Sequence, residues 1–168
     1  MTLIRGGTDS ATGRPFTGDF AGDVLYPTLI QHGWANGHFG KTADDGVQLN
    51  NCRITNAVRC VPPQNKPETA EIRTCNTFLT SEMAAMPNLK VVLALGSIAH
   101  SGVLRACGLK LSSAKFIHGA HHNIQPQFRK KPLILADTYH TSRYNLNTGV
   151  LTETMFDEVI AKLRPLVV

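Results

Sequence analysis

Two continuous apolar runs limit the folds open to this chain. The segments LKVVLALG (89–96) and KPLILAD (131–137) carry apolar side chains at successive positions, which is typical of strands buried on both faces of a parallel sheet. Helices are expected after these runs, over 97–108 and from about Thr152 to Leu163. Thr152 and Met155 stand where a capped helix would begin. Strands that alternate with helices predict an α/β fold, a three-layer sandwich around a short, mostly parallel sheet.

The remaining elements follow from turn residues and helical spacing. A helix is expected over 22–33, ending at Gly33, and another from Glu68 to about Met86 after Pro67. The segment 52–58 is β-prone, whereas 61–67 holds three prolines and must be irregular. Residues 1–22 are rich in Gly, Thr, Ser and Asp and are interpreted as loop. The whole length, 1–168, fits one domain.

Composition narrows the class of protein. Apolar residues make up 42% of the chain and charged residues 17%, which is globular composition. No apolar run approaches the ~20 residues of a membrane-spanning helix, and the first residues lack a signal-peptide core. A cytoplasmic location is therefore expected. The net charge of +5 favours a polyanionic partner such as nucleic acid.

Two polar loops are the first candidates for chemistry. Residues 58–67 and 138–149 each follow an expected strand directly. In layered α/β folds, ligands bind outside the carboxyl ends of the strands. His140, just beyond the second apolar run, is well placed for such a role.

Four segments together resemble the iron–sulfur uracil-DNA glycosylases. They are TGRPFTGD (12–19), ITNAVRCVPPQNKP (54–67), VVLALGSIA (91–99) and TYHTSRYNLNTG (138–149), and HGAH (118–121) adds a shorter match. The form PFTGD points to family 5, the type b branch. This resemblance implies a DNA-repair enzyme that flips a damaged base out of the duplex and hydrolyses its bond to deoxyribose. The implied substrates are uracil and possibly other deaminated bases in DNA, and a monomer is expected.

The resemblance also assigns roles to individual residues. Asp19 matches a carboxylate that orients water, and Phe16 matches an aromatic ring that stacks on the flipped base. Asn65 matches an asparagine near the base, and Asn56, at the end of an expected strand, is a second candidate for contact with the base. An amide suits this role because it both donates and accepts hydrogen bonds. His140 would stabilise the departing anionic base. Each also has an ordinary structural interpretation, as a turn Asp, a core Phe, a loop Asn or a structural His. DNA contacts are expected from Ser142, Arg143, Tyr144 and Asn145.

The cysteines depart from the pattern of a four-cysteine cluster. Cys60 and Cys75 match the third and fourth ligands of the family's 4Fe-4S cluster, whereas Cys52 and Cys107 are interpreted as core residues. The first two ligands and the family's first, central strand have no counterpart in the sequence. We therefore expect a chain that lacks an N-terminal segment, including that strand.

Three alternatives stay open at this stage. The chain could be a truncated, catalytically impaired remnant that binds DNA. A uracil-crosslinking relative is disfavoured because NKPETAEIR (65–73) lacks a basic insertion. A zinc protein would use His118, His121 and His122 together with cysteines, although no four-ligand spacing is present.

Overall fold

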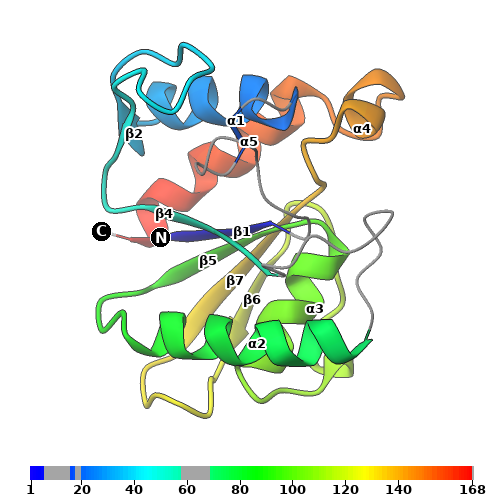
Figure 1. The fold of residues 1–168 in the computed structure, drawn as a ribbon. Coiled ribbons are helices and arrows are strands. Elements are labelled where there is room, and N and C mark those ends of the chain that lie inside the picture. The colour runs from blue at the N-terminus through cyan, green and yellow to red at the C-terminus, as the bar shows by residue number, and fades with distance from the viewer. Residues whose placement is uncertain (6–15, 18–19, 58–68, 168) are drawn as a thin grey trace.

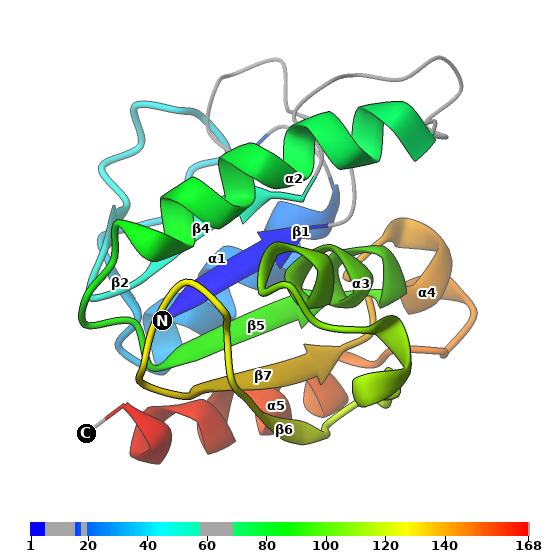
Figure 2. The same ribbon diagram turned by 90° about the horizontal axis from the view of Figure 1, so that it is seen from below.

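The computed structural model describes residues 1–5, 16–17, 20–57 and 69–167. Its centre is a five-stranded sheet of order β4-β1-β5-β7-β6, and a two-stranded sheet joins β2 to β3. The strands are β1 (Thr2–Arg5), β2 (Ala35–Asn36), β3 (Gln48–Leu49), β4 (Arg53–Asn56), β5 (Val91–Leu95), β6 (His121–Ile124) and β7 (Leu133–Thr138). β1, β4, β5 and β7 run parallel, and β6 pairs antiparallel with β7 at one edge (Figure 2).

Helices cover both faces of the large sheet, which confirms the three-layer α/β fold. α1 and α5 lie on one face, and α2 and α3 lie on the other (Figure 1). The helices are α1 (Phe20–Gln31), α2 (Thr69–Ala84), α3 (Ser97–Ala106), α4 (Arg143–Asn147) and α5 (Glu153–Leu163), with 3₁₀ turns at Leu111–Ser113 and Arg164–Leu166. In the part of the chain that the structure describes, no helix is long and apolar enough to cross a membrane.

Alternation along the strands explains the two cores. Leu3, Leu93 and Leu95 point into the cluster beneath α1 and α5. Their neighbours Ile4 and Val92 belong to the cluster beneath α2 and α3. Successive side chains of a strand point to opposite faces of its sheet, so apolar residues at every position of β5 are buried on both sides.

Helix ends follow the expected local chemistry. The Thr152 hydroxyl accepts a hydrogen bond from the Met155 N–H at 3.1 Å, which confirms the capped start of α5. α1 ends before Gly33, whose φ of 70° lies in the left-handed region that glycine tolerates.

The expectation that residues 1–22 form only loop is wrong at the start of the chain. Thr2–Arg5 is a strand and pairs in parallel with β4 on one side and β5 on the other. The expectation of a missing first strand is wrong for the same reason, because β1 fills an interior position of the sheet. The stretch TLIR is too short to show a periodicity, so only pairing with distant strands defines it.

Four further elements have no counterpart among those that the sequence predicts. β2 and β3 pair within the polar segment after α1, and α4 interrupts the loop 138–149. β6, with the sequence HHNI, is an edge strand whose side chains are mostly exposed or half-buried. Polar edge strands lack the apolar pattern of interior strands.

Candidate functional site

The carboxyl ends of four parallel strands lie at one edge of the sheet. Arg5 pairs with both Asn56 and Leu95, and Leu95 pairs with Thr138. The last residues of β4, β1, β5 and β7 therefore form one row, and the segments that leave them emerge at the same edge. This is the edge at which the sequence predicts the site.

His140 lies two residues beyond this row. A Cβ atom added to Gly96, which follows β5, would lie 3.5 Å from the Cβ of His140. The imidazole ring lies 6.1 Å from the ring of Phe16, centroid to centroid, with 36° between the planes. The structure thus brings together two of the predicted site residues, one from each end of the chain.

Phe16 is held in an unusual backbone conformation. Its φ of 62° lies in the left-handed region, which side chains rarely adopt. The ring is fully buried, at 0% exposure, in the core beneath α1 and α5. Gly22 of α1 lies against its carbonyl group, and a Cβ at that position would lie 1.7 Å from the Phe16 oxygen. This close contact fixes the turn that carries Phe16 against α1.

Asn56 brings a buried amide to the same edge. Thr55 hydrogen-bonds Glu82 of α2, so alternation directs the Asn56 side chain toward the opposite face, on which Phe16 lies. Asn56 is 9% exposed. Its Oδ1 atom is buried and has no hydrogen-bond partner among the described residues. A buried acceptor without a hydrogen-bond partner is uncommon, and it suits a ligand that donates a hydrogen bond.

The loop after His140 divides into a held part and an exposed part. The Asn145 side chain donates to the His140 carbonyl at 2.9 Å, and the Asn145 backbone N–H donates to the Ser142 hydroxyl at 3.3 Å. Arg143 is exposed, with its guanidinium 5.1 Å above the ring of Phe20. Tyr144 is 73% exposed. Ser142 and Asn145 therefore shape the loop, and the other two side chains lie at its surface.

Three of the predicted site residues, Asp19, Asn65 and Cys60, lie outside the described residues. Their positions relative to His140 and Cys75 therefore stay predictions.

The described cysteines lie at separate places. Cys75 is buried in the second turn of α2. Glu82, seven residues further along α2 and thus ~10 Å along its axis, pairs with Arg53 at the start of β4. Cys52, next to Arg53, therefore lies toward the amino edge of the sheet, away from Cys75. Burial raises the pKa of the Cys52 and Cys107 thiols to about 12 each. Neither thiol fits a cluster ligand together with Cys75.

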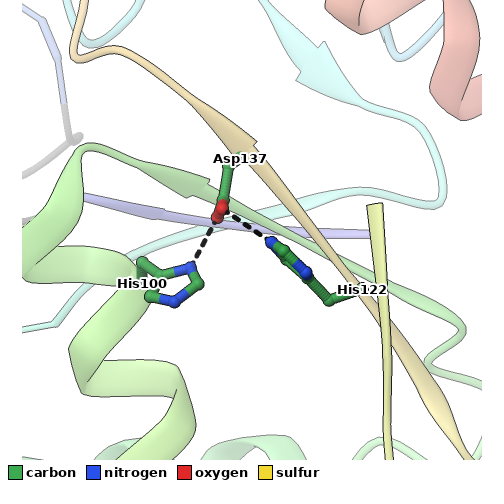
Figure 3. Close-up of side chains that lie close together, drawn as sticks. All are labelled: His100, His122 and Asp137. Atoms are coloured by element: carbon green, nitrogen blue, oxygen red, sulfur yellow. Dashed lines mark hydrogen bonds and ion pairs between the residues drawn. The ribbon is translucent and has the colours of Figure 1, made fainter. Parts of the chain in front are cut away.

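A buried carboxylate on β7 joins two histidines, as Figure 3 shows. Asp137 is 0% exposed and occupies a core position on the face covered by α3. Its Oδ1 lies 2.8 Å from His100 Nδ1, and its Oδ2 lies 3.1 Å from His122 Nε2. The backbone N–H of Ile117 donates to Oδ2 at 3.2 Å. The other His100 nitrogen faces the Ala114 carbonyl at 3.0 Å, so the imidazolium form makes both of its hydrogen bonds.

This cluster is better suited to hydrogen bonding than to metal binding. The ligand atoms of His100, His122 and Asp137 lie within 4.8 Å of one another, but both ring nitrogens of His100 already face hydrogen-bond partners, Asp137 and the Ala114 carbonyl. His118 and His121 are not members of the group. Among the described residues, the zinc hypothesis therefore finds no assembled site in the HGAHH segment.

Sequence reasoning did not single out Asp137 or His100. Both are embedded in apolar segments that were interpreted as core. The available signal was the acidic residue itself, because a carboxylate near the end of a fully buried strand requires hydrogen-bonding partners.

Comparisons with known proteins point to the same family as the sequence motifs. A family model described as the uracil DNA glycosylase superfamily matches residues 5–164. The Type-5 uracil-DNA glycosylase of Thermus thermophilus is 41% identical over 155 residues, which cover 92% of this chain and 68% of that protein. The protein of the same name from Mycobacterium tuberculosis is 37% identical over 157 residues, 92% of this chain and 57% of the relative. A third, from Pyrobaculum aerophilum, is 35% identical over 151 residues, 90% of this chain and 63% of the relative. The chain thus spans about three-fifths of the length of these curated relatives.

Proposed function

The chain belongs to the uracil-DNA glycosylase superfamily, and from that premise we propose that it hydrolyses the N-glycosidic bond of uracil in DNA. The observation that carries the proposal is the meeting of Phe16 and His140 at the carboxyl edge of the sheet. Relatives named Type-5 uracil-DNA glycosylase support the type b assignment. Other deaminated bases are secondary candidate substrates.

The proposed chemistry acts on a base that has been flipped out of the duplex. The scissile bond is not accessible inside the base stack, and its cleavage leaves negative charge on the departing uracil. His140 would donate a hydrogen bond to a uracil oxygen as that charge develops. Asp19 would orient the water that attacks the sugar. Phe16 would stack on the base after its ring, which is fully buried in this structure, becomes exposed. The hydrogen bond from Asn145 to the His140 carbonyl supports this role, because it fixes the backbone that carries the imidazole.

The proposed base reading uses amide side chains. Uracil presents an N3–H donor between two carbonyl oxygens, and the buried Oδ1 of Asn56 is an acceptor that needs a donor. Asn65 would supply a second amide. Cytosine has an acceptor at N3, so an acceptor in this position favours uracil over cytosine.

The proposed DNA contact is the loop that follows His140. The exposure of Arg143 and Tyr144 supports contacts to phosphate and to the exposed base step. Ser142 and Asn145 would act by keeping the loop in shape. The net charge of +5 favours approach to the DNA backbone.

The 4Fe-4S cluster is the least supported part of the proposal. Cys60 and Cys75 would provide two of its four thiolates. Cys52 does not complete the set, because it lies toward the opposite edge of the sheet from Cys75, and the pKa values of the Cys52 and Cys107 thiols are raised to about 12. No catalytic step depends on the cluster in this proposal. A brown protein that absorbs near ~400 nm and loses its colour in Cys75→Ser would support it.

An abasic-site assay on a uracil-containing duplex tests the function. The wild-type protein is expected to convert uracil sites to alkali-labile sites, and His140→Ala is expected to lose at least ~100-fold in rate. His38→Ala is the matched control, since His38 is an exposed histidine in the segment between β2 and β3. Binding of uracil DNA without base release by the wild-type protein would replace the proposal with a DNA-binding function. Full activity of His140→Ala would remove the site assignment.

A further inference from the structure

The backbone immediately before His140 is held by another histidine. The Thr138 carbonyl accepts a hydrogen bond from the Gly96 N–H at 2.8 Å, which is the last link between β7 and the chain after β5. The next N–H along the chain, that of Tyr139, donates instead to Nδ1 of His118 at 3.1 Å. The Tyr139 N–H, one residue before His140, is thus bonded by a side chain and not by a neighbouring strand.

The direction of this bond defines the state of the imidazole. A backbone N–H only donates, so Nδ1 of His118 must carry a lone pair and the ring proton must lie on Nε2. The Thr138 hydroxyl lies 3.5 Å from the same nitrogen. A second proton on the ring would place one N–H against another, and the bond to Tyr139 would be lost.

His118 also contacts the side chain of Tyr139. The two rings stack with 4.8 Å between centroids and 13° between planes. On the far side of His140, Asn145 holds the carbonyl group. His140 is therefore bracketed by His118 before it and Asn145 after it.

The surroundings favour the neutral ring. Burial, the largest effect, lowers the pKa of His118, Glu158 of α5 raises it, and Lys162 of α5 lowers it. Tyr139 is the titratable group stacked on the ring itself. A lowered pKa keeps the acceptor available at neutral pH and withdraws it as the pH falls.

We propose that His118 is a positioning residue for His140: as a neutral imidazole it fixes the Tyr139 N–H, and its protonation releases this bond and reduces uracil excision. This inference rests on the proposed function of His140. It makes the reaction sensitive to acid through a group that does not touch the substrate.

Two substitutions test separately the Nδ1 acceptor of His118 and its stacked ring. In His118→Asn the side-chain oxygen lies close to the position of Nδ1 and accepts the Tyr139 N–H, but it does not titrate. In His118→Phe the flat ring remains for stacking and the acceptor is gone. His121→Asn is the control, because His121 is an exposed histidine of β6 whose pKa is also lowered and which makes no contact with Tyr139 among those described.

The measurements are single-turnover excision rates from pH 5 to pH 8. His118→Asn is expected to keep the wild-type rate at pH 8 and to gain on wild type by up to about tenfold for each pH unit below the pKa of His118. His118→Phe is expected to lose at least about tenfold in rate with unchanged DNA affinity. His121→Asn should follow the wild-type profile. A wild-type profile in both His118 variants, or equal losses in both, would overturn the inference.

Nitrogen-15 NMR on the wild-type protein provides a readout without catalysis. The expected spectrum has the proton of His118 on Nε2 and a Tyr139 amide signal that shifts as His118 titrates. A proton on Nδ1 at neutral pH, or a Tyr139 amide that ignores the titration, would overturn the inference even if uracil is excised. Absence of excision by wild type would instead defeat the proposed function, and the NMR result would still decide whether His118 holds Tyr139.

Discussion

Exchanging Asp137 for asparagine tests whether the buried carboxylate holds the end of β7 in place. The carboxylate faces His100 Nδ1 at 2.8 Å, His122 Nε2 at 3.1 Å and the Ile117 N–H at 3.2 Å. Asparagine offers one oxygen and one amide group. With its oxygen toward His100, the amide places its NH2 against the Ile117 N–H; turned the other way, its NH2 meets His100 Nδ1, which can accept it only in the neutral ring with the proton on Nε2. In both orientations the carboxylate charge is gone.

The magnitude follows from burial. The Asp137 side chain is 0% exposed and that of His100 is 4% exposed, so water cannot replace the lost interaction. Leaving a buried hydrogen-bonding group without its partner costs roughly 1–3 kcal/mol, and more where a charged group is involved. The bond to His122 adds less, because that side chain is 20% exposed. We expect Asp137→Asn, which keeps one acceptor, to lower the free energy of unfolding by about 3 kcal/mol. For a domain of this size the Tm falls by ~6–12 °C.

Urea unfolding followed by far-UV circular dichroism measures the change. Trp34 is the one tryptophan of the chain, and its fluorescence checks that the transition is two-state. Asp157→Asn is the matched control, since Asp157 bonds His32 at 2.7 Å with its side chain 36% exposed, and should change stability by at most ~1 kcal/mol. A stability of Asp137→Asn within ~0.5 kcal/mol of wild type would refute the argument that the carboxylate anchors this region.

Three further outcomes are expected. Gly22→Ala places a Cβ 1.7 Å from the Phe16 carbonyl oxygen, so the free energy of unfolding in urea should fall by ~2 kcal/mol or more despite the higher helix propensity of alanine. The rate of uracil excision should fall as well. A wild-type stability together with a wild-type rate would contradict the described contact. Thr152→Ala removes the N-cap of α5 and should lower the free energy of unfolding by ~1 kcal/mol in the same assay; an unchanged midpoint would argue against the cap. Because partial burial raises the pKa of Cys52 to about 12, few of its thiols are ionised at pH 8, so iodoacetamide labelling read by mass spectrometry should be slow until the protein is unfolded; rapid labelling of the folded protein would show that the pKa of this thiol is not raised.

The sequence predicted the parts of the fold that carry strong local patterns. The apolar runs around β5 and β7 were identified because every position of β5, and every position of β7 except Ile134, is buried. α5 was identified with its cap. β1 was missed because four residues cannot show a pattern, and its position depends on β4 and β5. β6 was missed because an exposed edge strand needs no apolar face.

The candidate site was predictable where a motif and a strand end coincide. The resemblance assigned both His140 and Phe16 to the flipped base, and their rings lie 6.1 Å apart, while their roles stay predictions. The supporting histidines were harder to identify, because their role comes from contacts between distant segments. His118 was noted in the short match HGAH and as a possible zinc ligand, whereas its Nδ1 accepts from Tyr139. A sequence shows that an imidazole is present but not which partner its nitrogen meets.

The interior position of β1 bears on the order in which the sheet can assemble. Thr2 pairs with Arg53 on one side and with Val92 on the other, and both partners lie far later in the chain. β1 therefore has no complete place in the sheet until both later strands are present, and it has to enter between them. Closing such long loops slows folding, so we expect β1 to join the sheet late.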